Sequence, residues 1–254
     1  MQKVSYYILS DLIRNRVILG YVLLLATVGW GTFMVELPEK ALLVLMQVTL
    51  LALPLITMVF ATMYYYHAQE FILLLLAQPV TRSTVIGSTY TGLCIAFVGS
   101  FLVGIGVPLL LFYPTVTSLL LLVSGTLLTL IFIALALSIA TRVADKARGM
   151  GVTLLLWTFF AFLYDGILLF FMYQWGEYPI ERGVLVSSLL NPIDVARILI
   201  IMKTEASALL GLSGAVFQTF FNSSSGLVTS LSALLLWAVI PYGLARRRFV
   251  RKDM

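Results

Sequence analysis

Long apolar stretches alternate with short polar ones along the whole chain. Six of the stretches are apolar over roughly 20 residues, the length that an α-helix needs to cross the hydrocarbon core of a bilayer. We expect the membrane-spanning helices at about residues 17–35, 41–63, 90–112, 118–140, 150–173 and 227–244. The pattern therefore predicts an all-α integral membrane protein, with a single transmembrane domain over residues 1–254.

The composition agrees with a chain that has lipid as its solvent. Of its 254 residues, 61% are hydrophobic and only 11% are charged, whereas soluble domains are roughly half apolar and a quarter charged. Its 16 Lys+Arg against 11 Asp+Glu would suggest nucleic acid binding in a soluble protein. Here the basic residues lie between apolar stretches, so we expect a lipid bilayer and no nucleic acid as the partner.

The distribution of Lys and Arg predicts the orientation, because cytoplasmic loops carry the excess of both residues. If both termini are cytoplasmic, 12 of the 16 basic residues lie inside. The four outside are Lys40, Arg182, Arg197 and Lys203. We therefore expect a multi-pass protein with both termini in the cytoplasm.

Three segments outside the spans carry further information. Residues 1–16 have one apolar helical face, which predicts an N-terminal helix lying in the membrane interface. Residues 64–89 form the first long cytoplasmic loop, and residues 174–226 form a long outer segment. In the latter, Asn191 can cap a helix that has a proline at its first position. Apolar residues then recur at helical spacing, which predicts a short amphipathic helix on or dipping into the outer leaflet.

Two acidic residues stand out in the outer half of the chain. Asp194 and Arg197 are three residues apart, so they can pair on one helix. Asp165 lies inside the fifth span, where a charge costs at least about 2.5–3.5 kcal/mol on insertion scales. We favour a structural hydrogen bond from Asp165 to a neighbouring helix. The alternative is a polar translocation path, or a hinge with Gly166.

The sequence contains no strong catalytic or metal-binding motif. It has no G-x-x-x-x-G-K-[ST] phosphate loop and no pair of His or Cys at metal-ligand spacing. Residues 211–214 read GLSG, as in rhomboid serine proteases, but the histidine base is missing because His67 lies far upstream. Met58 and Met63 fall on different helix faces, which favours packing over Cu(I) binding. We expect no catalytic residue, metal or cofactor in this chain.

Residues 70–82 read EFILLLLAQPVTR and resemble the first cytoplasmic loop of ABC-2 type transporter permeases. The amphipathic start, the six spans and the basic segment around Arg142 also match that family. The resemblance implies an ABC-2 (type V exporter-like) fold. It further implies residence in a bacterial inner membrane.

The same resemblance implies partners and contact residues. ATP and Mg would bind to a separate ABC ATPase subunit, present in two copies beneath a homodimer of permeases. A short cytoplasmic helix would pass force from that subunit. The residues implied in this coupling are Tyr64, Tyr65, Glu70, Phe71, Pro79 and Arg82. A second cytoplasmic contact is implied at Arg142, Lys146 and Arg148.

Within the family, the chain most resembles permeases that support copper-site maturation of nitrous-oxide reductase. Tyr164-Asp165 and the outer run from Asn191 to Arg197 carry this likeness. It implies that Asn191, Asp194 and Arg197 contact a periplasmic repeat protein. A gliding-type permease and a drug or lipid exporter are alternatives in the same superfamily. An ATP-independent six-span channel or transporter is the alternative outside it.

Overall fold

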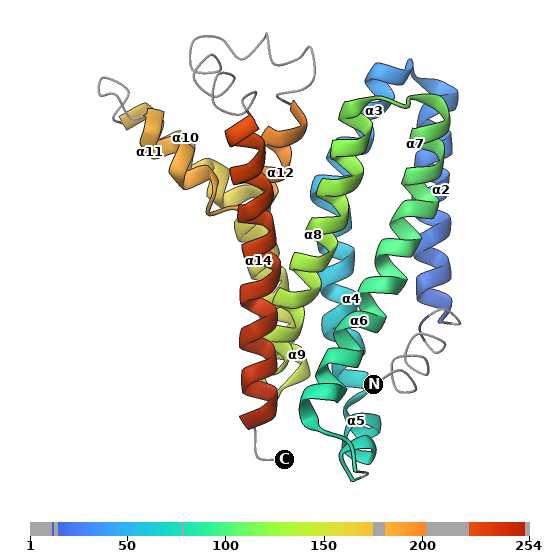
Figure 1. Ribbon diagram of the computed structural model, residues 1–254, viewed down its shortest axis with the longest axis vertical. Coiled ribbons are helices and arrows are strands. Elements are labelled where there is room, and N and C mark those ends of the chain that lie inside the picture. Colours follow the sequence, from blue (N-terminus) through green and yellow to red (C-terminus); the bar gives the residue numbers. More distant parts are fainter. Residues whose placement is uncertain (1–11, 13–14, 78, 175–180, 202–223, 252–254) are drawn as a thin grey trace.

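The computed structural model describes residues 12, 15–77, 79–174, 181–201 and 224–251, and every regular element in this part of the chain is a helix (Figure 1). Six helical segments are long and apolar enough to cross a membrane: Arg16–Val35, Pro38–His67, Arg82–Phe112, Val116–Ala140, Lys146–Gln174 and Gly226–Arg251. The six-span, all-α prediction is confirmed. Most of the helix that we predicted over residues 1–16 lies outside the described residues.

Several helices are longer than the apolar stretches that predicted them. The third begins at Arg82 rather than near residue 90, and the sixth continues to Arg251 rather than ending near residue 244. A helix satisfies its own backbone hydrogen bonds, so it does not need to end where the hydrocarbon ends. The polar extensions at Arg82 and Arg251 lie at the same end of the bundle, because Arg82 Nη1 donates a hydrogen bond to the Val250 carbonyl.

Three of the spans are uninterrupted α-helices and three contain a π-helical turn. The uninterrupted ones are α2 (Arg16–Val35), α8 (Val116–Ala140) and α14 (Ser224–Arg251). The second span consists of α3 (Pro38–Gln47), η1 (Val48–Ala52) and α4 (Leu53–His67). The third consists of α6 (Arg82–Phe101), η2 (Leu102–Gly106) and α7 (Val107–Phe112). The fifth consists of α9 (Lys146–Thr158), η3 (Phe159–Leu163) and α10 (Tyr164–Gln174).

Proline accounts for two of the π turns. Pro54 and Pro108 each stand at the second position of the α-helix that follows a π turn. A proline ring clashes with the carbonyl four residues earlier and offers no N–H to it, and a wider turn accommodates both effects. The Leu51 carbonyl in η1 accepts a hydrogen bond from the indole N–H of Trp157, 3.2 Å away. A neighbouring helix thus satisfies backbone near Pro54.

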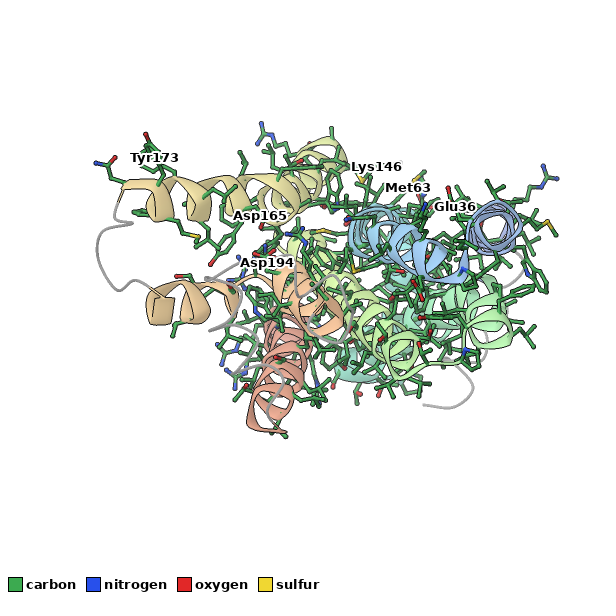
Figure 2. The ribbon with its side chains drawn as sticks, turned by 90° about the horizontal axis from the view of Figure 1, so that it is seen from above. Glu36, Met63, Lys146, Asp165, Tyr173 and Asp194 are labelled. Carbon is green, nitrogen blue, oxygen red and sulfur yellow. The ribbon has the colours of Figure 1, made fainter. Side chains whose placement is uncertain are left out.

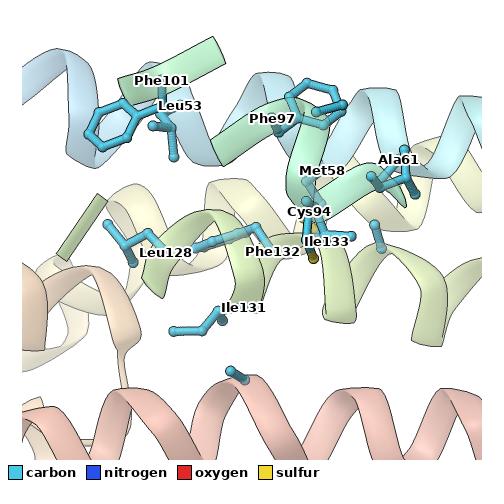
Figure 3. Close-up of a cluster of buried hydrophobic side chains, with 14 of the residues drawn as sticks. Leu53, Met58, Ala61, Cys94, Phe97, Phe101, Leu128, Ile131, Phe132 and Ile133 are labelled. Atoms are coloured by element: carbon cyan, nitrogen blue, oxygen red, sulfur yellow. The ribbon is translucent and has the colours of Figure 1, made fainter. Parts of the chain in front are cut away.

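Helix α8 is the centre of the bundle, and it packs against α4, α6, α9, α12 and α14. Figure 3 shows the side chains that fill the space between α4, α6 and α8. Met58, Phe97, Phe101 and Phe132 are buried there. Helix α2 crosses η2 at Gly29 and Gly104, where a Cβ on either glycine would overlap the opposite helix. Backbone contact at this crossing holds the first span against the third.

The fifth span leaves the bundle at its outer end. Helix α10 has no buried residue, and with α11 (Glu181–Ser188) it projects sideways from the other helices (Figures 1 and 2). The chain then returns as α12 (Pro192–Ile201), which lies against α8 and α14. A helix was predicted at this place in the outer segment. It is inserted between other helices, since Ile193, Val195 and Ile200 are fully buried.

Candidate coupling surface and ion-pair site

A short helix, α5 (Gln69–Leu76), follows α4 directly at the end of the bundle where α14 ends (Figure 1). Ile72 is buried and fixes α5 to the bundle. Phe71, Leu73 and Leu74 are exposed, and Leu74 is the most exposed of the three at 68%. Glu70 lies in the first turn of α5, where a carboxylate is favoured by the helix dipole. We call this exposed face of Glu70, Phe71, Leu73 and Leu74 the α5 surface.

The structure changes the list of residues predicted for coupling. Leu73 and Leu74 were not singled out, although the apolar run from Phe71 to Leu76 contained them. Tyr65 was named, but it is only 2% exposed and packs its ring against Tyr66 and Phe249. That assignment is wrong, because α4 continues to His67 and turns Tyr65 toward the core.

Tyr64, next to Tyr65 on α4, has a different environment. It is half-buried and lines a cavity of about 550 Å³ between α2, α4, α5 and α6. Phe71 and His67 line the same cavity. Tyr64 thus faces this cavity, and its role in coupling stays a prediction.

Arg82 and Pro79 follow the α5 surface along the chain. Pro79 is exposed between α5 and α6. Arg82 Nη1 donates a hydrogen bond to the Val250 carbonyl at 3.4 Å, and Arg246 Nε donates one to Ser83 Oγ at 2.7 Å. These bonds join the start of α6 to the end of α14. Arg82 thus makes a contact within the chain, and its role as a charged anchor for a partner stays a prediction.

The end of α4 and the start of α9 are brought together, although about 80 residues separate them in the sequence. Lys146 Nζ and His67 Nε2 are 2.7 Å apart, and the Tyr66 hydroxyl donates to the Val143 carbonyl at 2.8 Å. Asp145 caps α9 by accepting the Arg148 N–H at 2.7 Å. Both predicted cytoplasmic contact regions therefore belong to one end of the molecule. Arg142, Lys146 and Arg148 are exposed there.

A second candidate site joins the fifth span to α12. Arg197 Nη1 lies 2.5 Å from Asp165 Oδ2 and 3.2 Å from Asp194 Oδ1. The predicted pair of Asp194 and Arg197 is therefore present, and Asp165 has the partner on a neighbouring helix that we favoured. Figure 2 shows Asp165 and Asp194 close to each other where α10 leaves the bundle. We call these three residues the ion triad.

Asn191 organises the backbone around the ion triad. Its Oδ1 accepts the Ile193 N–H at 3.0 Å, which is the predicted cap of α12. Its Nδ2 donates to the Phe160 carbonyl in η3 at 2.9 Å. The Tyr164 hydroxyl also donates to the Ser187 carbonyl at 2.5 Å. The π turn of the fifth span is thus held by α12 and by the end of α11.

Burial corrects the predicted contact with a periplasmic protein. Asn191 is fully buried and Asp194 is 6% exposed, so their side chains cannot meet another protein. The sequence did not predict this burial. Asp194 and Arg197 are the only charged residues of α12, and Asp165, which also binds Arg197, comes from the fifth span. Arg197 retains partial exposure.

Burial also changes the acidity of the ion triad. Removal from water and the neighbouring Asp165 carboxylate together raise the pKa of Asp194 to about 7, while Arg197 and the Asn191 side chain oppose the shift. One positive and two acidic groups therefore share this site, and Asp194 takes up a proton near neutral pH.

The residues of the protease-like run GLSG lie outside the described part of the chain.

The comparisons with known proteins point to one family. The sequence model of a family described as "ABC-2 family transporter protein" matches residues 70–254. The chain is also 29% identical over 191 residues to a protein of Pseudomonas aeruginosa named "Probable ABC transporter permease protein NosY". That match covers 70% of this chain and 68% of the relative. The chain is thus a multi-pass membrane protein that belongs to the ABC-2 transporter family.

Proposed function

We propose that this ABC-2 permease subunit receives its driving force from a separate ATPase subunit that docks on the α5 surface. The exposed apolar face of α5 carries the proposal, because Phe71, Leu73 and Leu74 stand together with Glu70 at one end of the bundle. Apolar centres with polar rims are typical of protein interfaces. ATP and Mg would bind to the partner, in two copies, and this chain would supply no catalytic group.

The contacts of α4 explain how force on α5 would reach the spans. Only Ala68 separates α5 from α4, and α4 packs against α8 and α9 along its length. The contact of His67 with Lys146 connects the end of α4 to the start of α9. A tilt of α5 would therefore move the second span against the centre of the bundle. Arg142, Lys146 and Arg148 would form the second contact with the same ATPase.

A second copy of the chain would cover the fifth span. Helix α10 buries none of its residues in this chain, and Phe162, Leu169 and Phe170 are exposed. The side chains of Asp165 and Arg197 are about 30% exposed beside it. Charged groups facing lipid carry a free-energy cost, and packing of two copies would lower that cost. We therefore propose a homodimer that forms through this side of the molecule.

We also propose a cellular role from the relative named NosY. The chain would sit in a bacterial inner membrane with both termini in the cytoplasm, and it would act in copper-site maturation of nitrous-oxide reductase. A periplasmic repeat protein would then contact the outer end near α11, where Val186 and Leu190 are exposed. A drug or lipid exporter and a gliding-type permease remain the alternative functions within the family.

Affinity purification tests the ATPase proposal. The tagged protein, extracted from its native membrane in mild detergent, should bring down Mg-dependent ATPase activity. Leu74→Arg should abolish that activity in the eluate, because it places a charge in the apolar centre of the contact. Leu37→Arg is the matched control, since Leu37 is equally exposed but lies between α2 and α3 at the opposite end. A wild-type eluate without ATPase activity would favour the ATP-independent channel.

Complementation tests the cellular role. A denitrifying host that lacks its own NosY should regain nitrous-oxide reductase with bound copper when it expresses this chain with its own ATPase. Copper content and nitrous-oxide reduction are the measurements. An inactive, copper-free reductase in a host where the chain and the ATPase assemble would instead favour an exporter.

A further inference from the structure

Four arginines gather around one hollow at the end of α14. The hollow has a volume of about 620 Å³ and is lined by Thr141, Arg142, Leu244, Arg247, Arg248 and Arg251. All four arginines are exposed. No ion pair between residues that the structure describes involves any of them. The hollow therefore concentrates positive charge that the described part of the chain does not neutralise.

An apolar stripe on α14 leads to this hollow. Side chains three or four residues apart share one helix face, and Leu236, Ile240 and Leu244 recur at intervals of four. All three are exposed. The next two turns of the same face carry Arg247, Arg248 and Arg251, whereas Arg246 lies on another face and bonds Ser83. One face of α14 is thus apolar along the membrane and cationic at its end.

We propose that the arginine-lined hollow and the apolar stripe of α14, which together form one groove, bind an anionic phospholipid. Its headgroup phosphate lies among the four arginines, and its acyl chains lie along Leu236, Ile240 and Leu244. Guanidinium groups bind phosphate oxygens in a bidentate manner, and basic pockets between membrane helices bind such headgroups. The general excess of positive charge in cytoplasmic loops places arginines at this end of the chain. It does not require them to surround one hollow in line with an apolar stripe.

An acidic protein surface would fit the arginines but not the stripe. Leu236 lies about three turns from Arg247 on α14, within the span, where a soluble partner does not reach. A lipid is amphipathic along the same direction as the groove, so it matches both ends. The site consists of α14 residues together with Thr141 and Arg142, which follow α8. It shares only Arg142 with the proposed ATPase contact, so lipid binding does not depend on coupling to an ATPase.

Native mass spectrometry of the purified full-length protein tests the site. The protein in neutral detergent is titrated with phosphatidylglycerol and, separately, with phosphatidylcholine. The wild type should prefer phosphatidylglycerol by at least about tenfold, since each basic residue near an anionic headgroup contributes roughly fivefold. The triple variant Arg247→Gln, Arg248→Gln, Arg251→Gln should lose this preference. Arg246→Gln makes the same charge change on the other face of α14, so it should keep the preference.

Two results would overturn the proposal. One is equal binding of the two lipids by the wild type. The other is a triple variant that is folded by circular dichroism and still prefers phosphatidylglycerol as the wild type does. If that variant also no longer co-purifies ATPase activity, the four arginines bind a protein partner instead of a lipid. If the triple variant does not fold, the lipid preference of the single variant Arg248→Gln is measured instead. A several-fold loss of the preference supports the site, and an unchanged preference rejects it.

Discussion

Arg197 Nη1 lies 2.5 Å from Asp165 Oδ2, and this contact joins α12 to the fifth span at the place where α10 leaves the bundle. The same nitrogen is 3.2 Å from Asp194 Oδ1. A single guanidinium group therefore holds two carboxylates that come from different parts of the chain. Because Asn191 bonds the Phe160 carbonyl one turn earlier in the span, the ion triad and the π turn form one connected unit.

The first prediction concerns the two carboxylates of the ion triad. Asp165→Asn should keep the folded structure, because an amide oxygen can still accept from Arg197 and Asp194 still provides a charge. Asp165→Leu removes one of the two carboxylates that Arg197 binds, and the loss of such a hydrogen-bond partner typically costs about 1–3 kcal/mol. We expect a lower midpoint of thermal unfolding for Asp165→Leu and a nearly unchanged one for Asp165→Asn. Dye-based unfolding in detergent measures both.

The double variant Asp165→Asn, Asp194→Asn is the sharper test of that first prediction. It leaves Arg197 charged with no carboxylate among its described partners, so it should be much less stable than the two single variants together predict. Additive effects of the single variants would show that the two carboxylates do not share Arg197.

The second prediction concerns pH. Burial raises the pKa of Asp194 to about 7, so the folded protein binds a proton there that the unfolded chain releases near pH 4. This contribution to stability is fully present below the ordinary carboxylate pKa and is lost as pH rises through about 7. Asp194→Asn is always neutral and should remove this dependence.

Thermal unfolding of both proteins between about pH 5 and about pH 8 checks this dependence. The midpoint of the wild type should fall relative to that of Asp194→Asn as pH rises, by about 2–4 °C for each kcal/mol of lost stability. Parallel curves for the two proteins would mean that Asp194 does not titrate in this range. The difference between the curves isolates the contribution of Asp194.

The third prediction concerns Glu70 on the α5 surface. Glu70→Ala should weaken binding of the ATPase subunit, and Glu70→Arg should weaken it more, since truncating one member of a desolvated charge pair typically costs 2–5 kcal/mol. The permease itself should still insert, because Glu70 is exposed and far from the core. Co-purified ATPase activity and the amount of membrane-inserted chain are the two measurements.

Glu39→Arg is the control for the Glu70 variants, because Glu39 is also exposed in the first turn of a helix but lies at the opposite end, in α3. It should not affect ATPase binding. If Glu70→Arg co-purifies as much ATPase as the wild type does, the coupling contact lies elsewhere, and Arg142, Lys146 and Arg148 become the first residues to test.

The fourth prediction concerns orientation. In a background where Cys94 is replaced by alanine, a cysteine at Lys146 should be protected from a membrane-impermeant reagent in intact cells, and a cysteine at Glu39 should react. Both positions are exposed in the structure and lie at opposite ends of the spans, so access to the reagent depends on topology alone. Labelling at residue 146 with protection at residue 39 would reverse the proposed orientation.

The six membrane spans and the membership of the ABC-2 family could both be predicted from the sequence. Both results depend on properties that are local in the chain: the length of each apolar stretch, which the bilayer thickness fixes, and a contiguous run of residues from Glu70 to Arg82. The cap of α12 by Asn191 was predictable for the same reason, since a cap involves only neighbouring residues.

The partners of the polar residues inside the chain, in contrast, depend on how the helices pack. The partner of Asp165 is 32 residues away and the contact of His67 is 79 residues away, and no sequence period relates such positions. The family resemblance implied Tyr65 and Asp194 as partner contacts, but both are buried because α4 continues to His67 and α12 inserts between α8 and α14. Burial depends on where whole helices pack against one another, and that is settled by the summed contacts of the bundle rather than by any one segment.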